Sequence, residues 1–247
     1  MYSYFPAGDS GLIVKTIEGT VESPAPRLLG LMRCIEAARL EGVLDFIPSY
    51  QELLICYDRE QIAYDDLLEA VRGCAARTGK ALAAPAGALI RIPVVYGGRH
   101  GPDLEEVAAR CGMTGPEYAS LHAAPEYRVL MMGFLPGFGY MGMLDERLSV
   151  GRRLTPRPRI PAGSVGVANR QTAVYPLASP GGWNLIGRTP CVLFDPSREK
   201  AFLLAAGDRV QFKSVSEREF ELLKRDIEAG MPIAAELRHQ SGLRPPA

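Results

Sequence analysis

Glycine and proline set the strongest limit on what this chain can fold into, because they punctuate it densely from Gly97 onward. Between them the extended apolar segments are short, as in proteins built from many short strands. We expect strands near residues 127–133, 164–168, 172–175, 184–187, 191–194 and 208–215. Such a pattern is typical of a β-barrel or a β-sandwich.

The first ninety residues follow a different pattern, in which extended and helical segments alternate. Strands are predicted over 12–17, 43–47, 52–57 and 88–96, and helices over 24–40 and 62–77. The order β-α-β-β-α-β is typical of a split, ferredoxin-like sandwich. We therefore expect an α+β protein with an N-terminal lobe over 1–90, a barrel lobe over 91–237 and a polar tail over 238–247.

Three more helices are expected in the second lobe, over 103–110, 117–121 and 216–229. Thr114 with Glu117, and Ser216 with Glu219, have the spacing of a capping box, which fixes a helix start.

Composition excludes several function classes. The chain has 28 basic and 28 acidic residues, which argues against broad attraction to nucleic acid or an anionic membrane. The most apolar stretch, 129–144, is interrupted by Pro136 and glycines and is too short to span a bilayer as a helix. The N-terminus does not resemble a signal peptide. Five scattered cysteines favour reduced thiols, and so a cytoplasmic protein without a zinc site.

Gly137, Gly139 and Gly142 have the G-x-G-x-x-G spacing of a dinucleotide-binding loop. Such a loop needs a helix after its last glycine, because the pyrophosphate binds at that helix N-terminus. Here at most two helical turns fit before the next prolines. The acidic residue expected about twenty positions later is replaced by Ala162. The match is therefore interpreted as a coincidence of spacing.

Two residues are candidates for proton transfer or nucleophilic attack. His122 lies near a predicted helix end, where an imidazole is either a proton carrier or a partner of the helix dipole. Ser164 lies in AGSVG, which lacks the first glycine of a nucleophile elbow, so a polar strand residue is the alternative.

Two other segments have residues suited to ligands. Four arginines lie between 152 and 159, and two prolines stiffen their backbone, so they are either an anion-binding segment or a solvated loop. The only tryptophan, Trp183, lies among glycines that permit close backbone approach. Its ring either forms the wall of a pocket or fills space in the protein interior.

Four stretches occur in a fixed order: GFLPGFGYMGMLDERL from 133, RRLTPRPRIPAGSVGVANRQTAVYP from 152, SPGGWNLIGRTP from 179 and AAGDRVQF from 205. Together they closely resemble the family called allophanate hydrolase subunit 1, also known as the B subunit of the prokaryotic 5-oxoprolinase. That family includes a sporulation-kinase inhibitor and the carboxyltransferase part of urea carboxylase. GDSGLIV, over 8–14, and RIPVVYGGRHGPDLEEVA, over 91–108, are similar to it as well.

The resemblance implies a cyclophilin-like β-barrel and the ATP-dependent hydrolysis of 5-oxoproline to glutamate. It implies two partner subunits, one of them a homologous carboxyltransferase-like subunit. Phosphorylating a lactam oxygen needs anion-binding groups near the developing charge. We expect ATP at a site shared with the partners, no bound metal, and a chain that is inactive alone. The alternatives are an inhibitor of a sensor histidine kinase and a carboxyltransferase-type domain acting on urea or allophanate.

The expected site combines residues from these segments. The candidate catalytic residues are His122 and Arg157. The candidate substrate-binding residues are Phe134, Pro136, Gly137, Phe138, Ser164, Gln171, Tyr175, Gly182, Trp183 and Arg188. We expect the segments around Phe138, Arg157 and Trp183 to converge at one face of the barrel, where small ligands usually bind.

Overall fold

The computed structural model describes residues 2–16, 26–78, 87–230 and 238–239. The chain divides into two compact units, Met1–Ala86 and Gly87–Ala247. Within the described ranges, no helix is both long enough and apolar enough to cross a membrane.

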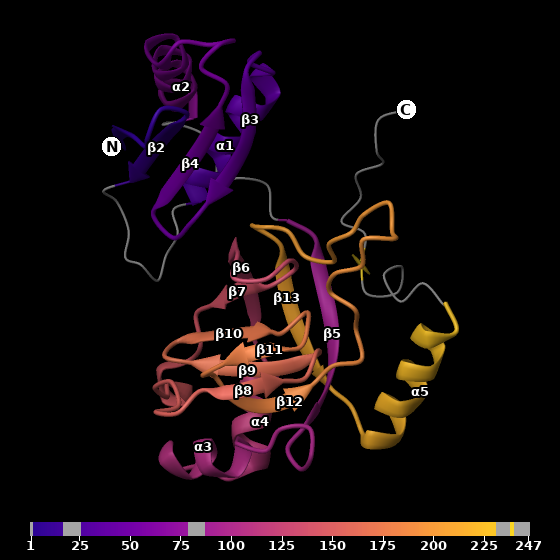
Figure 1. Ribbon diagram of the computed structural model, residues 1–247. Helices are drawn as coiled ribbons and strands as arrows, with labels where there is room; N and C mark the ends of the chain where they lie inside the picture. The colour runs from indigo at the N-terminus through magenta and orange to yellow at the C-terminus, as the bar shows by residue number, and fades with distance from the viewer. Residues whose placement is uncertain (1, 17–25, 79–86, 231–237, 240–247) are drawn as a thin grey trace. The chain divides into compact units, whose positions relative to one another are not determined.

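The first unit is a four-stranded antiparallel sheet with two helices (Figure 1). Its elements are β1 (Tyr2–Pro6), β2 (Gly11–Thr16), α1 (Pro26–Ala38), β3 (Val43–Pro48), β4 (Glu52–Tyr57) and α2 (Tyr64–Thr78). In the sheet order β1-β2-β4-β3, both β2 and β3 run antiparallel to β4. They are therefore parallel to each other with β4 between them, which is the predicted split β-α-β arrangement.

The fourth strand of this sheet is not the predicted one. The segment expected over 88–96 forms β5 (Leu89–Tyr96), which pairs with strands of the second unit. The edge beside β2 is occupied instead by β1, which was not predicted and reaches β2 through a tight turn closed by Ala7 N–H donating to the Gly11 carbonyl. The edge is thus filled locally, and β5 is left for the barrel.

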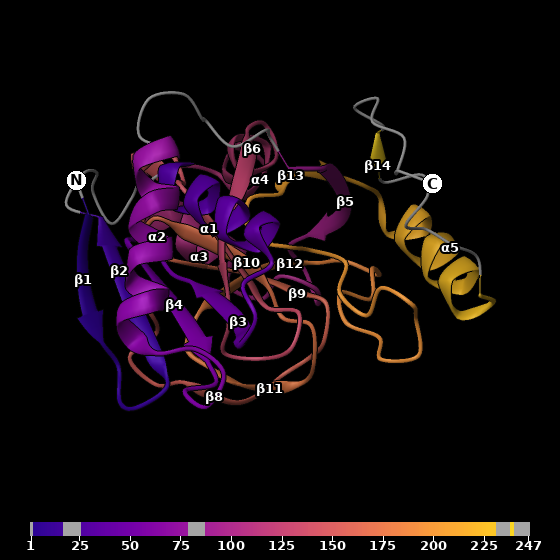
Figure 2. The same cartoon turned by 90° about the horizontal axis from the view of Figure 1, so that it is seen from above.

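The core of the first unit lies on one face of its sheet. Every second residue of β4 is buried, namely Leu53, Ile55 and Tyr57, as expected for a strand with one covered face. Leu31 of α1 and Val71 of α2 are fully buried in the same cluster, so α1 and α2 pack side by side on that face (Figure 2).

The second unit contains a closed seven-stranded barrel. Its strands are β5, β6 (Glu126–Met132), β7 (Gly139–Gly142), β9 (Ser164–Ala168), β10 (Gln171–Val174), β12 (Asn184–Arg188) and β13 (Arg209–Ser214). The order β12-β9-β10-β7-β6-β13-β5 closes where β12 pairs with β5. Only the β13–β5 pair within this ring is parallel. The predicted α+β class and the barrel are confirmed.

Several strand predictions need correction. Residues 191–194 form no regular strand but a loop with an isolated bridge between Phe194 and Phe202. β7 and the ribbon of β8 (Arg157–Ile160) and β11 (Ser179–Gly181) were not predicted. These strands have three or four residues and contain glycine or proline, so they lack the alternation that reveals a strand. β14 (Arg238–His239), in the expected tail, pairs with β5.

The helices of the second unit are α3 (Leu104–Arg110), α4 (Gly115–Ala123) and α5 (Glu217–Glu228), with a 3-10 turn at Glu146–Leu148. Both predicted capping boxes are present, from Thr114 to Glu117 and from Ser216 to Glu219. α5 lies beside β5 and buries Phe220 (Figure 1).

Candidate functional site

An aromatic cluster is formed by residues that directly precede β7, follow β10 and precede β12. The ring centroid of Phe138 is 5.3 Å from that of Tyr175 and 5.8 Å from that of Trp183, and all three residues are buried. Tyr140 lies 6.0 Å from Trp183. The rings meet edge to face, a favourable geometry for aromatic pairs. Trp183 therefore packs inside the structure.

Phe134 differs from the other aromatic residues of this loop. Its φ is +68°, in the left-handed region that side chains usually avoid, and 60% of its surface is exposed. Its ring touches only the edge of Phe138 among the ring contacts of the described residues. Because an unfavourable backbone conformation is often retained for function, this exposed aromatic residue is a candidate for a functional contact.

The predicted basic segment is held by a buried acid. Asp103, whose side chain is 4% exposed, accepts hydrogen bonds from Arg157 at 2.7 and 2.8 Å and from Arg153 at 2.9 Å. It also accepts one from the Leu185 backbone N–H at 2.7 Å. β8 pairs Arg157 with Gly181, and Arg153 N–H donates to the Gly182 carbonyl. This segment is therefore adjacent to the Trp183 segment, with Arg157 already bound to an internal carboxylate.

His122 lies inside the barrel unit and is fully buried. Its Nδ1 is 2.8 Å from the Tyr96 hydroxyl, and its Nε2 is 2.9 Å from Thr172 Oγ1. Because Thr172 donates to the Gly166 carbonyl, its oxygen accepts from Nε2–H, and Tyr96 donates to Nδ1. Burial lowers the pKa of His122 to about 3. A neutral, enclosed imidazole with both nitrogens bonded favours a structural role over the expected catalytic one.

The remaining predicted residues are scattered around these features. Ser164 is buried at the start of β9, and its carbonyl accepts from Tyr175 N–H. Gln171 begins β10 and pairs with Ala168 and Gly142. Pro136 is exposed in the loop before Phe138.

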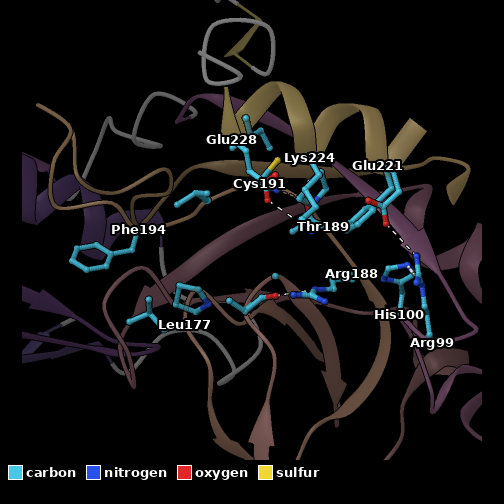
Figure 3. A pocket seen from close by; sticks show the side chains of 17 residues that line it. Arg99, His100, Leu177, Arg188, Thr189, Cys191, Phe194, Glu221, Lys224 and Glu228 are labelled. Atoms are coloured by element: carbon cyan, nitrogen blue, oxygen red, sulfur yellow. Dashed lines mark hydrogen bonds and ion pairs between the residues drawn. The ribbon is translucent and has the colours of Figure 1, made fainter. Parts of the chain in front are cut away.

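A cavity of about 470 Å³ lies between one end of the barrel and α5 (Figure 3). Its wall combines loops next to β5, β9 and β10 with the end of β12, the loop after β12 and one face of α5. The lining residues include Arg99, His100, Gly163, Leu177, Arg188, Cys191, Phe194, Phe220 and Lys224. Among the predicted site residues, only Arg188 lines it.

The glycine-rich loop touches this cavity wall. A Cβ built on Gly137 would lie 2.9 Å from Phe194 Cβ and 3.3 Å from Pro176 Cβ, and both of these residues line the cavity. Gly137 also has a φ of +83°. A glycine is needed there because any side chain would be strained and would collide with Phe194.

Arg188 is the last residue of β12 and points across the cavity floor (Figure 3). Its Nε donates to the Ala162 carbonyl at 3.0 Å. Cys191, on the same wall, is buried, and that burial raises the pKa of its thiol to about 11. This thiol is therefore neutral near pH 7.

One group in the described part of the chain has donor atoms that resemble a metal site. His100, Glu217 and Glu221 place ligand atoms within 4.8 Å of one another. Arg99 lies among them, at 2.5 Å from Glu217 and 3.1 Å from Glu221. Both carboxylates of this group therefore already form ion pairs with one arginine. The expectation of no bound metal stays a prediction.

Sequence reasoning missed Asp103 and the contribution of α5. Asp103 immediately precedes α3 and looks like an ordinary helix-capping residue, although its side chain makes no capping bond. Its real partners are 50 and 54 residues away. No local signal reveals such a pair.

A family model described as the carboxyltransferase domain, subdomain C and D, matches residues 2–204. The chain is 36% identical over 235 residues to the 5-oxoprolinase B subunit of Bacillus subtilis, covering 91% of this chain and 98% of that protein. It is 54% identical over 128 residues to the 5-oxoprolinase B subunit of Escherichia coli O157:H7, covering 52% of this chain and 59% of that protein.

Among solved structures, the urea carboxylase of Kluyveromyces lactis matches 93% of this chain with a TM-score of 0.71. The sequence identity is 20%, and the match covers 23% of that longer protein. This likeness shows the fold.

Proposed function

We propose that this chain, which belongs to the family of the carboxyltransferase domain's subdomains C and D, is the B subunit of a 5-oxoprolinase. The resemblance found in the sequence is confirmed by the family match and by the relatives from B. subtilis and E. coli. The observation that carries the proposal is the B. subtilis relative, which aligns with the chain over nearly its whole length. The alternative role as a kinase inhibitor is not favoured by these names.

The proposed reaction is the ATP-dependent opening of 5-oxoproline to glutamate. ATP phosphorylates the lactam oxygen and ADP leaves. One water adds to the activated carbon and the C–N bond breaks, which leaves an acyl phosphate, and a second water hydrolyses this acyl phosphate to glutamate and phosphate. Developing negative charge in such steps is stabilised by positively charged groups and oriented hydrogen-bond donors. This chain would provide one wall of a composite site, and ATP would bind at a site shared with its partners.

The need for partner subunits is supported by the state of the chain's own candidate catalytic groups. His122 and Ser164 are buried, and His122 is bonded at both ring nitrogens. Arg157 is bound to Asp103. None of the three is free to reach a substrate in this arrangement. The catalytic groups would therefore be completed by other subunits.

A surface for a partner is also available on the second unit. Gly137 of the glycine-rich loop lies next to Pro176 and Phe194. Four exposed apolar residues either lie close to these three positions along the chain or contact the Phe194 ring, namely Phe134, Leu177, Val192 and Phe202. We name these four residues the apolar loop face. Clustered exposed apolar side chains are typical of protein interfaces. We propose that a homologous carboxyltransferase-like subunit packs on this face.

Reconstitution tests the proposed function. The chain is co-expressed with candidate carboxyltransferase-like and hydrolase subunits, and glutamate release from 5-oxoproline is measured with and without ATP. We expect turnover only from the assembled complex with ATP. Turnover by the purified chain alone, or an assembled complex that releases no glutamate, would contradict the proposal.

A further inference from the structure

The cavity beside α5 has two chemically different ends (Figure 3). Leu177 and Phe194 line one end, and Arg99 and His100 line the other. Arg188 lies between them. A volume of about 470 Å³ lies in the range of small-molecule sites. The cavity therefore offers apolar cover on one side of a guanidinium group.

Arg188 differs from the other arginines near the cavity and the ribbon in what its terminal nitrogens do. Arg99 binds two glutamates, and Arg157 binds Asp103. The guanidinium of Arg188 is anchored through Nε to the Ala162 carbonyl. Within the described residues, its two terminal nitrogens make no ion pair or hydrogen bond. A guanidinium fixed at Nε with two free terminal donors is shaped to receive two oxygens of one carboxylate.

The two acidic residues that line the cavity with Arg188 already have other cationic partners. Glu221 is bound to Arg99, and Glu228 lies 3.8 Å from Lys224. Both acids are thus paired with other cations, and neither of them binds Arg188. A Cβ added at Gly163 would collide with the Thr189 carbonyl oxygen and would lie 3.6 Å from Arg188 Cγ, so there is little free space beside the start of the Arg188 side chain. Arg188 is held in place before any ligand arrives.

We propose that this cavity binds the carboxylate of a small organic acid. Arg188 donates hydrogen bonds to the two carboxylate oxygens. The carbon skeleton of the acid packs against Pro176, Leu177 and Phe194. Resting on the proposed function, we identify the acid as 5-oxoproline, whose ring is small enough for the apolar end. The shared chemistry also admits the product glutamate, so the experiment separates the two.

The test measures binding to the full-length purified chain by titration calorimetry, with 5-oxoproline, its neutral carboxamide, glutamate and inorganic phosphate as probes. We expect 5-oxoproline to bind and the carboxamide to bind at least about thirtyfold more weakly, as for loss of one partner of a desolvated charge pair. Arg188→Ala should cause a similar loss. Arg188→Lys should lose about tenfold, because lysine keeps the charge without the fork.

Two variants control for folding and for charge. Arg159→Ala removes an exposed arginine of β8 outside the cavity and should leave binding unchanged. Leu177→Asp keeps Arg188 but places a negative charge at the apolar end. It should weaken 5-oxoproline binding even if Arg188→Ala fails to fold. Equal binding of the acid and its carboxamide, phosphate binding in place of both acids, or unchanged binding in Leu177→Asp and Arg188→Ala overturns the proposal.

Comparing ligand binding with turnover by the assembled complex tests the cavity assignment and the proposed function independently. If Arg188-dependent carboxylate binding is found but the assembled complex does not convert 5-oxoproline, the cavity assignment stands and the function fails. If only glutamate binds, the carboxylate site stands and 5-oxoproline is the wrong acid. If the complex converts 5-oxoproline with Arg188→Ala at the rate and KM of the unaltered complex, the cavity assignment fails and the function stands.

Discussion

Arg157 binds both oxygens of Asp103, with its Nη1 2.8 Å from one and its Nη2 2.7 Å from the other. This fork joins the ribbon strand β8 to the residue before α3, 54 residues away. Because Arg153 binds the same acid, two arginines of the segment expected to be either anion-binding or solvated are bound to one buried carboxylate. The fork fixes the backbone that pairs with Gly181, next to the Trp183 segment.

Arg157→Ala is expected to lower the free energy of unfolding by about 2–3 kcal/mol. Removing one partner of a buried ion pair costs about 3–5 kcal/mol, and Arg153 retains part of the compensation for Asp103. Denaturant unfolding measures the change. Arg159→Ala, two residues away and exposed, should change stability by less than about 0.5 kcal/mol. Equal effects of both variants would mean that the ion pair between Arg157 and Asp103 does not contribute to the free energy of unfolding.

His122 should make the stability of the second unit depend on pH. Burial lowers the pKa of His122 to about 3, below the ordinary value of 6.5. Below pH 6.5 the unfolded chain therefore binds a proton that the folded chain does not. The contribution of neutral His122 to the free energy of unfolding is fully present above pH 6.5 and is lost as the pH falls toward 3. We expect a loss of about 2 kcal/mol between pH 7 and pH 5.

The contribution of His122 is isolated by comparing unfolding at several pH values with that of His122→Gln. Glutamine does not titrate, so the difference in stability between the two proteins should shrink as pH falls from 7 to 5. A difference that stays constant over this range would contradict an enclosed, neutral imidazole.

Gly163→Ala tests how tightly the cavity wall is packed. Gly163 has a φ of +80°, and an added Cβ would overlap the Thr189 carbonyl oxygen. Backbone strain and overpacking together should cost about 2–4 kcal/mol. Gly98→Ala is the matched control, because Gly98 has a φ of +52° with no atom near the added Cβ. It should cost about 1 kcal/mol, and thermal unfolding of both variants measures the difference.

Substitutions on the apolar loop face should weaken assembly without unfolding the chain. Phe134→Gly places glycine at a φ of +68°, which relieves backbone strain while removing an exposed ring. Combined with Phe202→Ser, it should lower the affinity for the carboxyltransferase-like partner at least about tenfold, as for loss of interface aromatics.

Phe5→Ser is the control for this surface. Phe5 and Phe202 are both 49% exposed, but Phe5 belongs to the first unit. Affinity is measured by titrating the purified partner against each variant. Loss of affinity with Phe5→Ser alone, or retention of the partner by a fragment of residues 1–86 and not by one of residues 87–247, would place the interface on the first unit.

Local patterns predicted much of the secondary structure because the responsible forces are local. The capping boxes at Thr114 and Ser216 satisfy backbone groups within one helical turn, so their spacing alone reveals them. Longer strands such as β4 and β13 have enough alternating residues to be recognised. β7, β8 and β11 exist because of pairing with distant strands, and their few residues do not show it.

The family, the α+β class with its barrel, and the segments from which a site would be built could all be predicted from the order of residues along the chain. The order and residue types of these segments are properties of the sequence and do not depend on how the chain folds. The tertiary structure alone decided which arginine is available to a ligand. Arg157 and Arg188 look alike in sequence, but Asp103 reaches the first across 54 residues, while the second keeps its terminal donors in a cavity. Electrostatic pairing acts through space over a few ångströms, so only the folded chain assigns the partners.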